Sequence, residues 1–488
     1  MNSDSAFKGV QMEERYDKPN LPNRTNGKTT IEEEMAEREI LTDETLRIIK
    51  KLLPDLLTDL AKIMDDRKKN VRYTLPMLMV YGILQFALHY TSRRETNREM
   101  TAPIIRENLK ALFPELGTLP HGDTLYRLLD TIEVVKIEEA QCKLIKVLMY
   151  NKKFKNYLVN GKYRIAIDGT QKLARKGEWG DEYLLRHVGK NKEPQSYIYV
   201  LEAVLVLENG MTIPFMSEFL TNRDSESEND SLEKIKQDCE RKAFRRLAKR
   251  IRKMFPKQPL VLMMDSLYAT GPVLAICKDN NWDYMINFKE GSMPAVFKEA
   301  QALMKFTPEN KVHAMWGNRK QIYTYINNLE YDYIDQETGG VRRLKLNVAQ
   351  CFEQWVEIKA DGSKEENETT YVWLSARALK ESNVFSRCTL IARYRWQIEN
   401  NILVEKHQGY GYSHIYASSV NALKGYHYLS KIAHFIMTLV MMSSKVIEKV
   451  REVGKRGFIR FLRRCLEGSL LRLERIRSNR LGYLQLVA

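Results

Sequence analysis

The chain has 488 residues, 44% of them hydrophobic, which is enough for several domains and a sizeable core. This composition excludes a fibrous or fully disordered protein. With 78 lysine and arginine residues against 62 acidic residues, the formal net charge of +16 favours nucleic acid or an anionic membrane surface as a partner. A basic soluble protein without such a partner has the same composition.

Three sequence features bear on the compartment. The 6 cysteines are scattered without a CxxC pair, which disfavours a disulfide framework or zinc site and suits a reducing cytoplasm. No basic segment followed by an apolar core begins the chain, so no signal peptide is expected. The apolar stretches Thr74–Tyr90 and Ile432–Met442 are interrupted or short, so we expect buried helices and no membrane association.

The N-terminal third is predicted to be a polar tail followed by helices. Residues 1–40 are polar and contain two prolines, which is typical of a mobile tail. Residues 41–157 show helical periodicity, with one helix through LTDETLRIIKKLLPDLLTDLAKIM and a second long helix beginning at Asp123 or Thr124.

Residues 158–291 change to an α/β pattern. KYRIAIDGT predicts a short strand that ends in a turn at Asp168 and Gly169, and two strands follow around an Asn-Gly turn at Asn209 and Gly210. A charged helix over about 231–254 precedes the apolar strand PLVLMMDS, the helix ATGPVLAICKDNNW and the strand DYMINFK. These elements predict a mixed sheet covered by helices.

The remaining chain is predicted to form three further units. Residues 292–385 contain alternating runs such as KQIYTYINNLEYDYI, typical of a mainly β insertion. Residues 386–444 return to helical periodicity and would complete the α/β core. Residues 445–488 form a basic, amphipathic helical region that would bind DNA or a second protomer, with arginines at Arg460, Arg463, Arg464, Arg472, Arg475, Arg477 and Arg480.

Three acidic residues are the candidates for chemistry. Asp168 and Asp265 each follow a predicted strand, where the carboxyl edge of an α/β sheet opens to ligands, and Glu399 lies on a later helix. Three carboxylates would suit two Mg²⁺ or Mn²⁺ ions that act on a phosphodiester. Taken singly, Asp168 is better explained as a turn residue, Asp265 as a helix cap and Glu399 as an ion pair with Arg395, but chance explains the three together much less well.

The helix of Glu399 carries a more specific pattern. Arg395, Glu399 and Lys406 are spaced by four and seven residues, which places them on one helical face. The glutamate could hold a metal ion while Arg395 and Lys406 bind flanking phosphates.

The spacing R-x3-E-x6-K, together with RWQIEN, resembles the DDE transposases of bacterial insertion sequences, in the group with a Y-x2-R-x3-E-x6-K signature. The D-G-T at Asp168, the apolar strand ending in D-S at Asp265 and the β insertion before Glu399 are also similar to that group. The intervals between the three acids are 97 and 134 positions, and the resemblance covers about residues 160–440.

This resemblance implies an α/β, ribonuclease-H-like catalytic core with a mainly β insertion, flanked by helical regions. It implies that Asp168, Asp265 and Glu399 hold two Mg²⁺ or Mn²⁺ ions and that the enzyme cuts element ends and joins them to target DNA. Its expected partners are terminal inverted repeats, bound by the helical N-terminal region, and target DNA, with a dimer on DNA. Its expected location is the bacterial cytoplasm, at the nucleoid.

One residue departs from the signature. Its tyrosine would fall at Ala392, whereas Tyr394 lies two residues later, about 200° around an ideal helix. Tyr394 can replace it as a DNA contact only if the helix begins late or irregularly.

Weaker candidates and other functions remain open. His407 and His414 suit a surface or core, and the tryptophans of the insertion (Trp316, Trp355 and Trp373) suit its core better than base stacking. Four cations after the first aspartate, Lys172, Arg175, Lys176 and Arg186, would form a loop along DNA or in solvent. Alternatives to a transposase are a ribonuclease-H-like nuclease without strand transfer and a transposase-derived DNA-binding protein.

Overall fold

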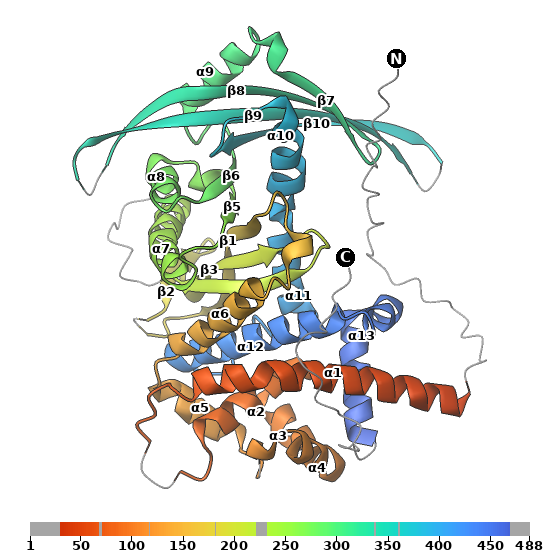
Figure 1. Cartoon of the computed structure of the whole chain (residues 1–488). Helices are drawn as coiled ribbons and strands as arrows, with labels where there is room; N and C mark the ends of the chain where they lie inside the picture. The colour runs from red at the N-terminus through yellow and green to blue at the C-terminus, as the bar shows by residue number, and fades with distance from the viewer. Residues whose placement is uncertain are drawn as a thin grey trace.

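The fold is that of a computed structural model, which describes residues 30–67, 71–116, 118–180, 182–220, 232–335, 338–359 and 362–468, without the side chains of 232–239. Figure 1 shows a long curved sheet at one end, a central α/β region and a layer of helices at the other end. The predicted mixed α/β architecture with helical flanks is confirmed at this level.

The N-terminal layer consists of six helices: α1 Ile31–Leu60, α2 Leu75–Ala87, α3 Arg93–Met100, α4 Pro103–Leu112, α5 Gly122–Thr131 and α6 Val135–Tyr150. Helix α1 begins earlier than expected, because Thr30 and Glu33 form a capping box at its start. The predicted tail is therefore helical from Ile31, and residues 1–29 lie outside the described part.

The predicted single helix beginning at Asp123 or Thr124 was wrong, because the chain forms α5 and α6 there. The side-chain amide of Asn421 donates to the carbonyl oxygens of Leu129, Asp130 and Ile132 at 3.0–3.1 Å. This tertiary contact satisfies the C-terminal carbonyls of α5 and lets the helix end where periodicity alone predicted continuation.

The strands belong to one mixed sheet: β1 Tyr163–Lys176, β2 Leu184–Val188, β3 Glu193–Val206, β4 Thr212–Phe219, β5 Leu260–Met264, β6 Asp283–Asn287, β7 Lys311–Trp316, β8 Arg319–Ile334, β9 Val341–Ile358 and β10 Lys364–Ser375. The order is β2-β3-β1-β5-β6-β10-β9-β8-β7, with β4 on β3, and only β1–β5 and β5–β6 are parallel. Residues 292–385, predicted to form a β-rich insertion, contain β7 to β10, and β10 pairs with β6, so these strands extend the central sheet.

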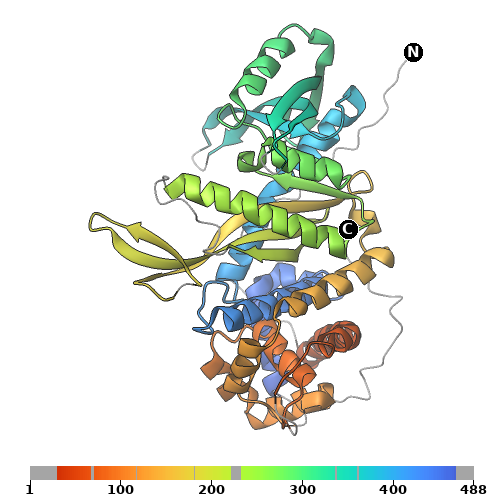
Figure 2. The ribbon, with the colours of Figure 1, turned by 90° about the vertical axis from the view of Figure 1, so that its left-hand side faces the viewer.

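The predicted turn after Asp168 was wrong. Strand β1 passes through Asp168 and Gly169 to Lys176, because β3 pairs with it from Arg164 onward. Beyond the central sheet, β1, β2 and β3 project as a ribbon, visible at the left of Figure 2. The cations expected in a loop therefore lie in strands, and Lys172 is only 5% exposed.

Helices cover both faces of the central strands. One face meets α7 Leu232–Met254 and α8 Gly271–Asp279, while α9 Pro294–Met304 packs on β8 of the insertion. The other face meets a segment of changing helix type: α10 Glu381–Phe385, a π-helix at Ser386–Ile391, a 3₁₀ helix η7 at Ala392–Trp396 and α11 Gln397–His407. The regular helix expected around Arg395 thus begins only at Gln397.

The helices α12 Val420–Met441 and α13 Ile447–Gly468 close the fold. Helix α12 is almost wholly buried and packs against α2, α5, α6 and β4. One hydrophobic core extends from Leu41 to Leu466, and the two apolar stretches lie in α2 and α12 as buried helices, as predicted. Among the described helices, none combines the length and apolarity that a membrane crossing requires.

Candidate active site

The two aspartates lie at the same edge of the parallel pair β1–β5. The last paired residues are Ala166 and Met263, and each aspartate comes two residues later. Asp168 continues β1, whereas Asp265 follows the end of β5. Both side chains are partly exposed although the strands beneath them are buried. The parallel register therefore brings together two residues that are 97 positions apart.

Arg395 joins the first aspartate to the glutamate. Its guanidinium donates from Nη1 to Asp168 Oδ2 and from Nη2 to Glu399 Oε1, both at 3.1 Å. The Arg395 side chain is only 9% exposed, against 23% for Asp168 and 36% for Glu399. The expected ion pair between Arg395 and Glu399 is present, and it also reaches Asp168 across 227 positions of sequence.

Asp265 has a structural role beside its candidate chemical role. Its Oδ1 accepts a hydrogen bond from the backbone N–H of Leu267 at 3.0 Å, so it caps a short 3₁₀ turn. Burial and the negative charge of Asp168 raise the pKa of Asp265, while Leu267 and Arg395 oppose this shift. The influence of Asp168 indicates that the two carboxylates lie close to each other.

Lys406 also faces β1. Its ammonium donates to the Thr170 hydroxyl at 3.0 Å, two residues after Asp168 on the strand. Burial lowers the pKa of Lys406, and the charges of Glu202 and Glu405 counteract part of that effect. Arg395 and Lys406 therefore both contact β1, and Glu399 joins this group through Arg395, which lies in the 3₁₀ segment before α11.

Tyr394 lies apart from this group. Its ring lies beneath the guanidinium of the buried Arg164, with 4.2 Å between the guanidinium carbon and the ring centroid. Arg164 is four residues before Asp168 on β1, roughly 13 Å along an extended strand. The late and irregular helix start required for a signature role is present, but a DNA contact by Tyr394 stays a prediction.

The donor set suits a hard divalent cation, because Asp168, Asp265 and Glu399 offer only carboxylate oxygens. In the part of the chain that the structure describes, no three acidic, histidine or cysteine side chains are grouped closely enough to hold a metal ion together. The Arg395 guanidinium supplies the positive charge between Asp168 and Glu399, and its Nε lacks a hydrogen-bond partner among the described residues. A cation bound by both carboxylates would therefore compete with Arg395.

A fourth carboxylate, not predicted from the sequence, lies behind Gly169. Glu240 on α7 is 4% exposed and accepts a hydrogen bond from the Tyr268 hydroxyl at 3.1 Å. A Cβ on Gly169 would lie 2.6 Å from the Tyr199 ring and 2.7 Å from the Glu240 carboxyl carbon, so only glycine fits there. The sequence could have indicated that Glu240 is buried, because it lies on the same helical stripe as the core residues Phe244, Leu247 and Ile251.

A buried ion network anchors α11 to the sheet and to α12. The Lys431 ammonium contacts Glu405 at 2.7 Å and Glu202 at 3.0 Å, and His434 contacts Glu405 at 2.8 Å. All four side chains are at most 3% exposed. Glu202 lies opposite Asp168 in the β1–β3 register, and Glu405 shares α11 with Glu399. The sequence signal was an isolated charge within each of two apolar runs, YIYVLEAVLVL and KIAHFIMTLVMM.

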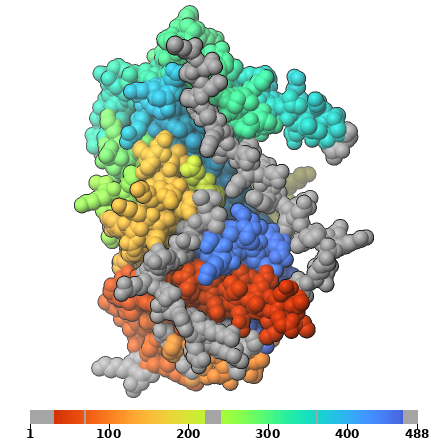
Figure 3. All heavy atoms as spheres, turned by 45° about the vertical axis from the view of Figure 1, so that its right-hand side comes forward, coloured from red at the N-terminus to blue at the C-terminus, as the bar shows by residue number. Residues whose placement is uncertain are grey.

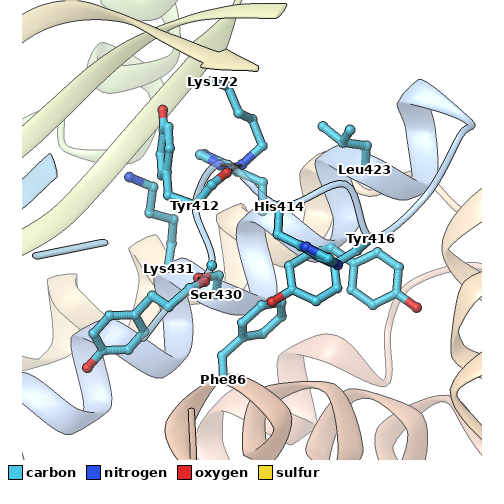
Figure 4. A pocket seen from close by; sticks show the side chains of 12 residues that line it. Phe86, Lys172, Tyr412, His414, Tyr416, Leu423, Ser430 and Lys431 are labelled. Carbon is cyan, nitrogen blue, oxygen red and sulfur yellow. Dashed lines mark hydrogen bonds between the residues drawn. The ribbon is translucent and has the colours of Figure 1, made fainter. Parts of the chain in front are cut away.

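Lys172 and Tyr412 extend this network toward a small pocket between β1, α2 and α12 (Figure 4). Lys172 Nζ donates to the Tyr412 carbonyl oxygen at 2.7 Å, and the Tyr412 hydroxyl donates to Glu202 at 2.8 Å. His414 contributes to the pocket wall and packs edge-on against Tyr416. His407 is the last residue of α11.

The insertion contacts the 3₁₀ segment through a cation–aromatic cluster. Glu353 is fully buried and pairs with both Arg319 and Arg393, while these arginines lie over Trp355 and Trp316 at 3.8 and 4.7 Å. Trp373 is buried and stacks on Tyr371. Because Arg393 is two residues before Arg395, this cluster holds the segment that carries the arginine of the site.

No known protein-family model matches this chain, and no curated protein resembles it in sequence.

Proposed function

We propose that this chain is a DDE transposase that cuts DNA at the ends of an insertion sequence and joins the freed ends to target DNA. The observation that carries the proposal is Arg395 bridging Asp168 and Glu399 at the edge where Asp265 also lies. Arg395 and Glu399 of the R-x3-E-x6-K spacing are thereby linked to Asp168 on β1, and Asp265 follows the neighbouring strand at the same edge.

The central sheet supports a ribonuclease-H-like core. Strands β4, β3 and β1 are antiparallel, β5 and β6 continue in parallel, and helices cover both faces. The aspartates lie on β1 and directly after β5, at the carboxyl edge where ligands bind to α/β sheets.

Asp168, Asp265 and Glu399 would hold two Mg²⁺ or Mn²⁺ ions after Arg395 releases Asp168 and Glu399. This release is needed because the three carboxylates are not grouped closely enough to share an ion while these contacts are in place. Such ions supply activation of an attacking oxygen and stabilisation of the leaving oxygen in a phosphodiester exchange. Arg395 and Lys406 would bind DNA phosphates beside the three carboxylates, which keeps the reacting strand in position. The helical N-terminal region would bind the terminal inverted repeats, and a dimer on DNA, at the bacterial nucleoid, would hold two ends together.

The test uses DNA that carries the sequence flanking this gene. The protein and its Glu399→Gln variant are incubated with Mg²⁺, Mn²⁺ or Ca²⁺, and Glu299→Gln, an exposed glutamate on α9, serves as the matched control. We expect breaks at defined ends and joined products with Mg²⁺ or Mn²⁺, lost in Glu399→Gln and kept in Glu299→Gln. Asp265→Asn should likewise abolish cleavage while leaving end binding intact.

Other outcomes distinguish the alternatives. Breaks without joined products would indicate a nuclease on the same core. Binding without cleavage under every metal would indicate a DNA-binding derivative and overturn the catalytic proposal.

A further inference from the structure

Helix α13 has two halves of different electrostatic character. Gly454, with a φ of 73°, kinks the helix between them. In the first half, cations and anions pair: Lys449 contacts Glu37 and Glu452 at 3.1 and 2.9 Å, and Arg451 contacts Glu448 at 2.7 Å. The second half contains five cations and a single carboxylate, in the sequence KRGFIRFLRRCLEG. Positive charge is therefore concentrated after the kink.

The apolar side of this second half fixes its orientation. Phe458, Ile459 and Leu462 are buried, and α13 packs on α4, where the Asn108 amide donates to the Leu466 carbonyl oxygen at 2.8 Å. Arg463 lies over the Tyr90 ring at 4.4 Å and pairs with Glu95 at 3.4 Å. This arginine has a structural role and leaves the others to face outward.

Three outward arginines form what we call the arginine stripe: Arg456, Arg460 and Arg464. All three are exposed, and their spacing of four residues puts them on one side of the helix. Within the described ranges, no carboxylate lies within ion-pair distance of any of them, in contrast to the paired charges before Gly454. An ordinary solvated helix face would intersperse both signs, as the first half of α13 does.

The dimensions of the stripe suit a nucleic-acid backbone. Eight residues of α-helix span roughly 12 Å, and one strand of duplex DNA presents a phosphate about every 3.4 Å of its axis. The stripe can therefore meet three phosphates, and the planar guanidinium is the side chain best matched to phosphate oxygens. Three cations that have no carboxylate partner among the described residues are unsuited to the core of a contact with a second copy of this basic chain.

The residue that precedes the stripe lies near the ion network of α11 and α12. Lys455, at the start of the second half, lies near enough to His434 to lower the pKa of that imidazole, after the larger effect of burial. His434 contacts Glu405, which precedes Lys406 at the end of α11. Figure 3 shows part of the blue C-terminal chain, which includes α13, at the molecular surface beside α1.

We propose that Arg456, Arg460 and Arg464 bind the phosphate backbone of double-stranded DNA outside the active site. This inference rests on the proposed function for the identity of the polyanion. Because the contacts are with phosphates alone, they would raise the affinity for any duplex and would not select the terminal repeats.

The test measures DNA binding without chemistry. Fluorescence anisotropy with a labelled DNA duplex, in EDTA and over a range of salt concentrations, compares the full chain with the triple variant Arg456→Ala, Arg460→Ala and Arg464→Ala. Loss of three phosphate contacts should weaken binding about ten-fold or more and reduce the slope of log affinity against log salt by about 2.7. Alanine preserves helix propensity, and circular dichroism checks that the variant folds.

Two controls separate the stripe from total charge and from folding. The variant Lys257→Ala, Lys278→Ala and Lys305→Ala removes three exposed cations elsewhere and should leave the salt slope within about one unit of the original. Replacing the three stripe arginines by lysine keeps the charges and should retain most of the slope.

Several outcomes would overturn the inference. If the slope of log affinity against log salt is unchanged in the alanine triple variant, the stripe does not bind DNA phosphates, whether or not the chain cleaves DNA. A changed oligomeric state with unchanged DNA affinity, measured by sedimentation, would assign the face to a second copy of the chain. Conversely, stripe-dependent binding without any metal-dependent cleavage would overturn the proposed catalysis and leave the stripe supported.

Discussion

At the scale of single residues, Arg395 determines the electrostatics of the candidate site. Its two hydrogen bonds share one positive charge between Asp168 and Glu399, and its side chain is nearly buried. A divalent cation that binds both carboxylates must displace these contacts. The same arginine is thus expected to weaken metal binding in the absence of DNA and to support phosphate binding in its presence.

Arg395→Ala tests this double role. Without DNA, the variant should bind Mn²⁺ about ten-fold more tightly, a gain of about 1.4 kcal/mol, because two carboxylates lose their competing cation. DNA cleavage should fall about 100-fold or more, since a positioned donor to the reacting phosphate is lost. Electron paramagnetic resonance of free Mn²⁺ measures the first effect and end-labelled DNA the second.

Arg343→Ala is the control, because Arg343 also pairs with a carboxylate, Asp332 at 3.0 Å, on the exposed surface of the insertion. It should change neither quantity. Unchanged Mn²⁺ affinity in Arg395→Ala would show that the guanidinium does not compete for the metal ligands.

The structure places Lys172 in a different environment from the one predicted from the sequence. Sequence placed it in a basic loop, whereas the structure buries its ammonium against the Tyr412 carbonyl oxygen and His427. Burial, aided by the charge of Lys431, lowers the pKa of Lys172 to about 7 from the usual 10.5. The folded state therefore binds this proton less tightly than the unfolded chain does.

The sign of the pH effect follows from that difference. The unfolded chain holds more protons between about pH 7 and the usual pKa, so the free energy of unfolding should rise with pH across this window. Lys172 contributes a slope of up to about 1.4 kcal/mol per pH unit. Lys172→Met should remove this rise, and Lys278→Met, at an exposed lysine on α8, should keep it, as measured by urea unfolding from pH 7 to 9. An identical pH profile for wild type and Lys172→Met would contradict the prediction.

At the scale of elements, the sequence predicted most strands correctly and located Asp265 after a strand and Glu399 on a helix. Periodicity and β-branched runs identified β3 to β6 and β8 to β10, because those strands satisfy local preference and burial together. The turn predicted at Asp168 failed because the local Asp-Gly signal is weaker than pairing with the whole of β3. The break between α5 and α6 depends on Asn421, nearly 300 residues away, and no local pattern contains it.

The candidate site was predictable only in part for the same reason. Spacing predicted the contact between Arg395 and Glu399, since residues four positions apart are close neighbours along the chain. Other parts of the site depend on contacts between distant chain segments. These are the hydrogen bond from Arg395 to Asp168, the packing of Glu240 against Gly169 and the ion network that joins α11 to the sheet and α12. For Glu202, Glu240 and Lys431, the sequence showed only that each charged residue has apolar neighbours along the chain.

The ion network of Glu202, Glu405, Lys431 and His434 should stabilise the packing of α11 against the sheet and α12. Lys431→Met leaves Glu202 and Glu405 buried without their shared cation, so we expect the free energy of unfolding to fall by about 3–5 kcal/mol. Adding Glu405→Gln should recover part of this loss, giving a coupling energy on the order of 1–3 kcal/mol in a double-mutant cycle. Urea denaturation of the four proteins measures both values, and additive effects would mean that Lys431 and Glu405 do not interact.

At the scale of the whole molecule, the chain folds around shared cores and one continuous sheet. A single hydrophobic cluster contains residues from α1 to α13 and from the central strands, and α12 packs against both the N-terminal helices and β4. The insertion continues the sheet through β10 on β6, and Glu353 ties it to Arg393 beside the site. Movement of one layer would therefore displace residues of the site.

This continuity predicts that the layers unfold together. Three of the 6 tryptophans, Trp316, Trp355 and Trp373, report on the insertion by fluorescence, while far-ultraviolet circular dichroism reports mainly on the helical layers. In urea, both signals should change with the same midpoint, because separating either layer exposes the shared core or the edge of β6. Lys431→Met should shift the two midpoints equally, since its buried contacts join α12 to the sheet and to α11. Two separate midpoints, or a shift of the circular dichroism signal alone, would show that the insertion folds independently of the helices that position Glu399.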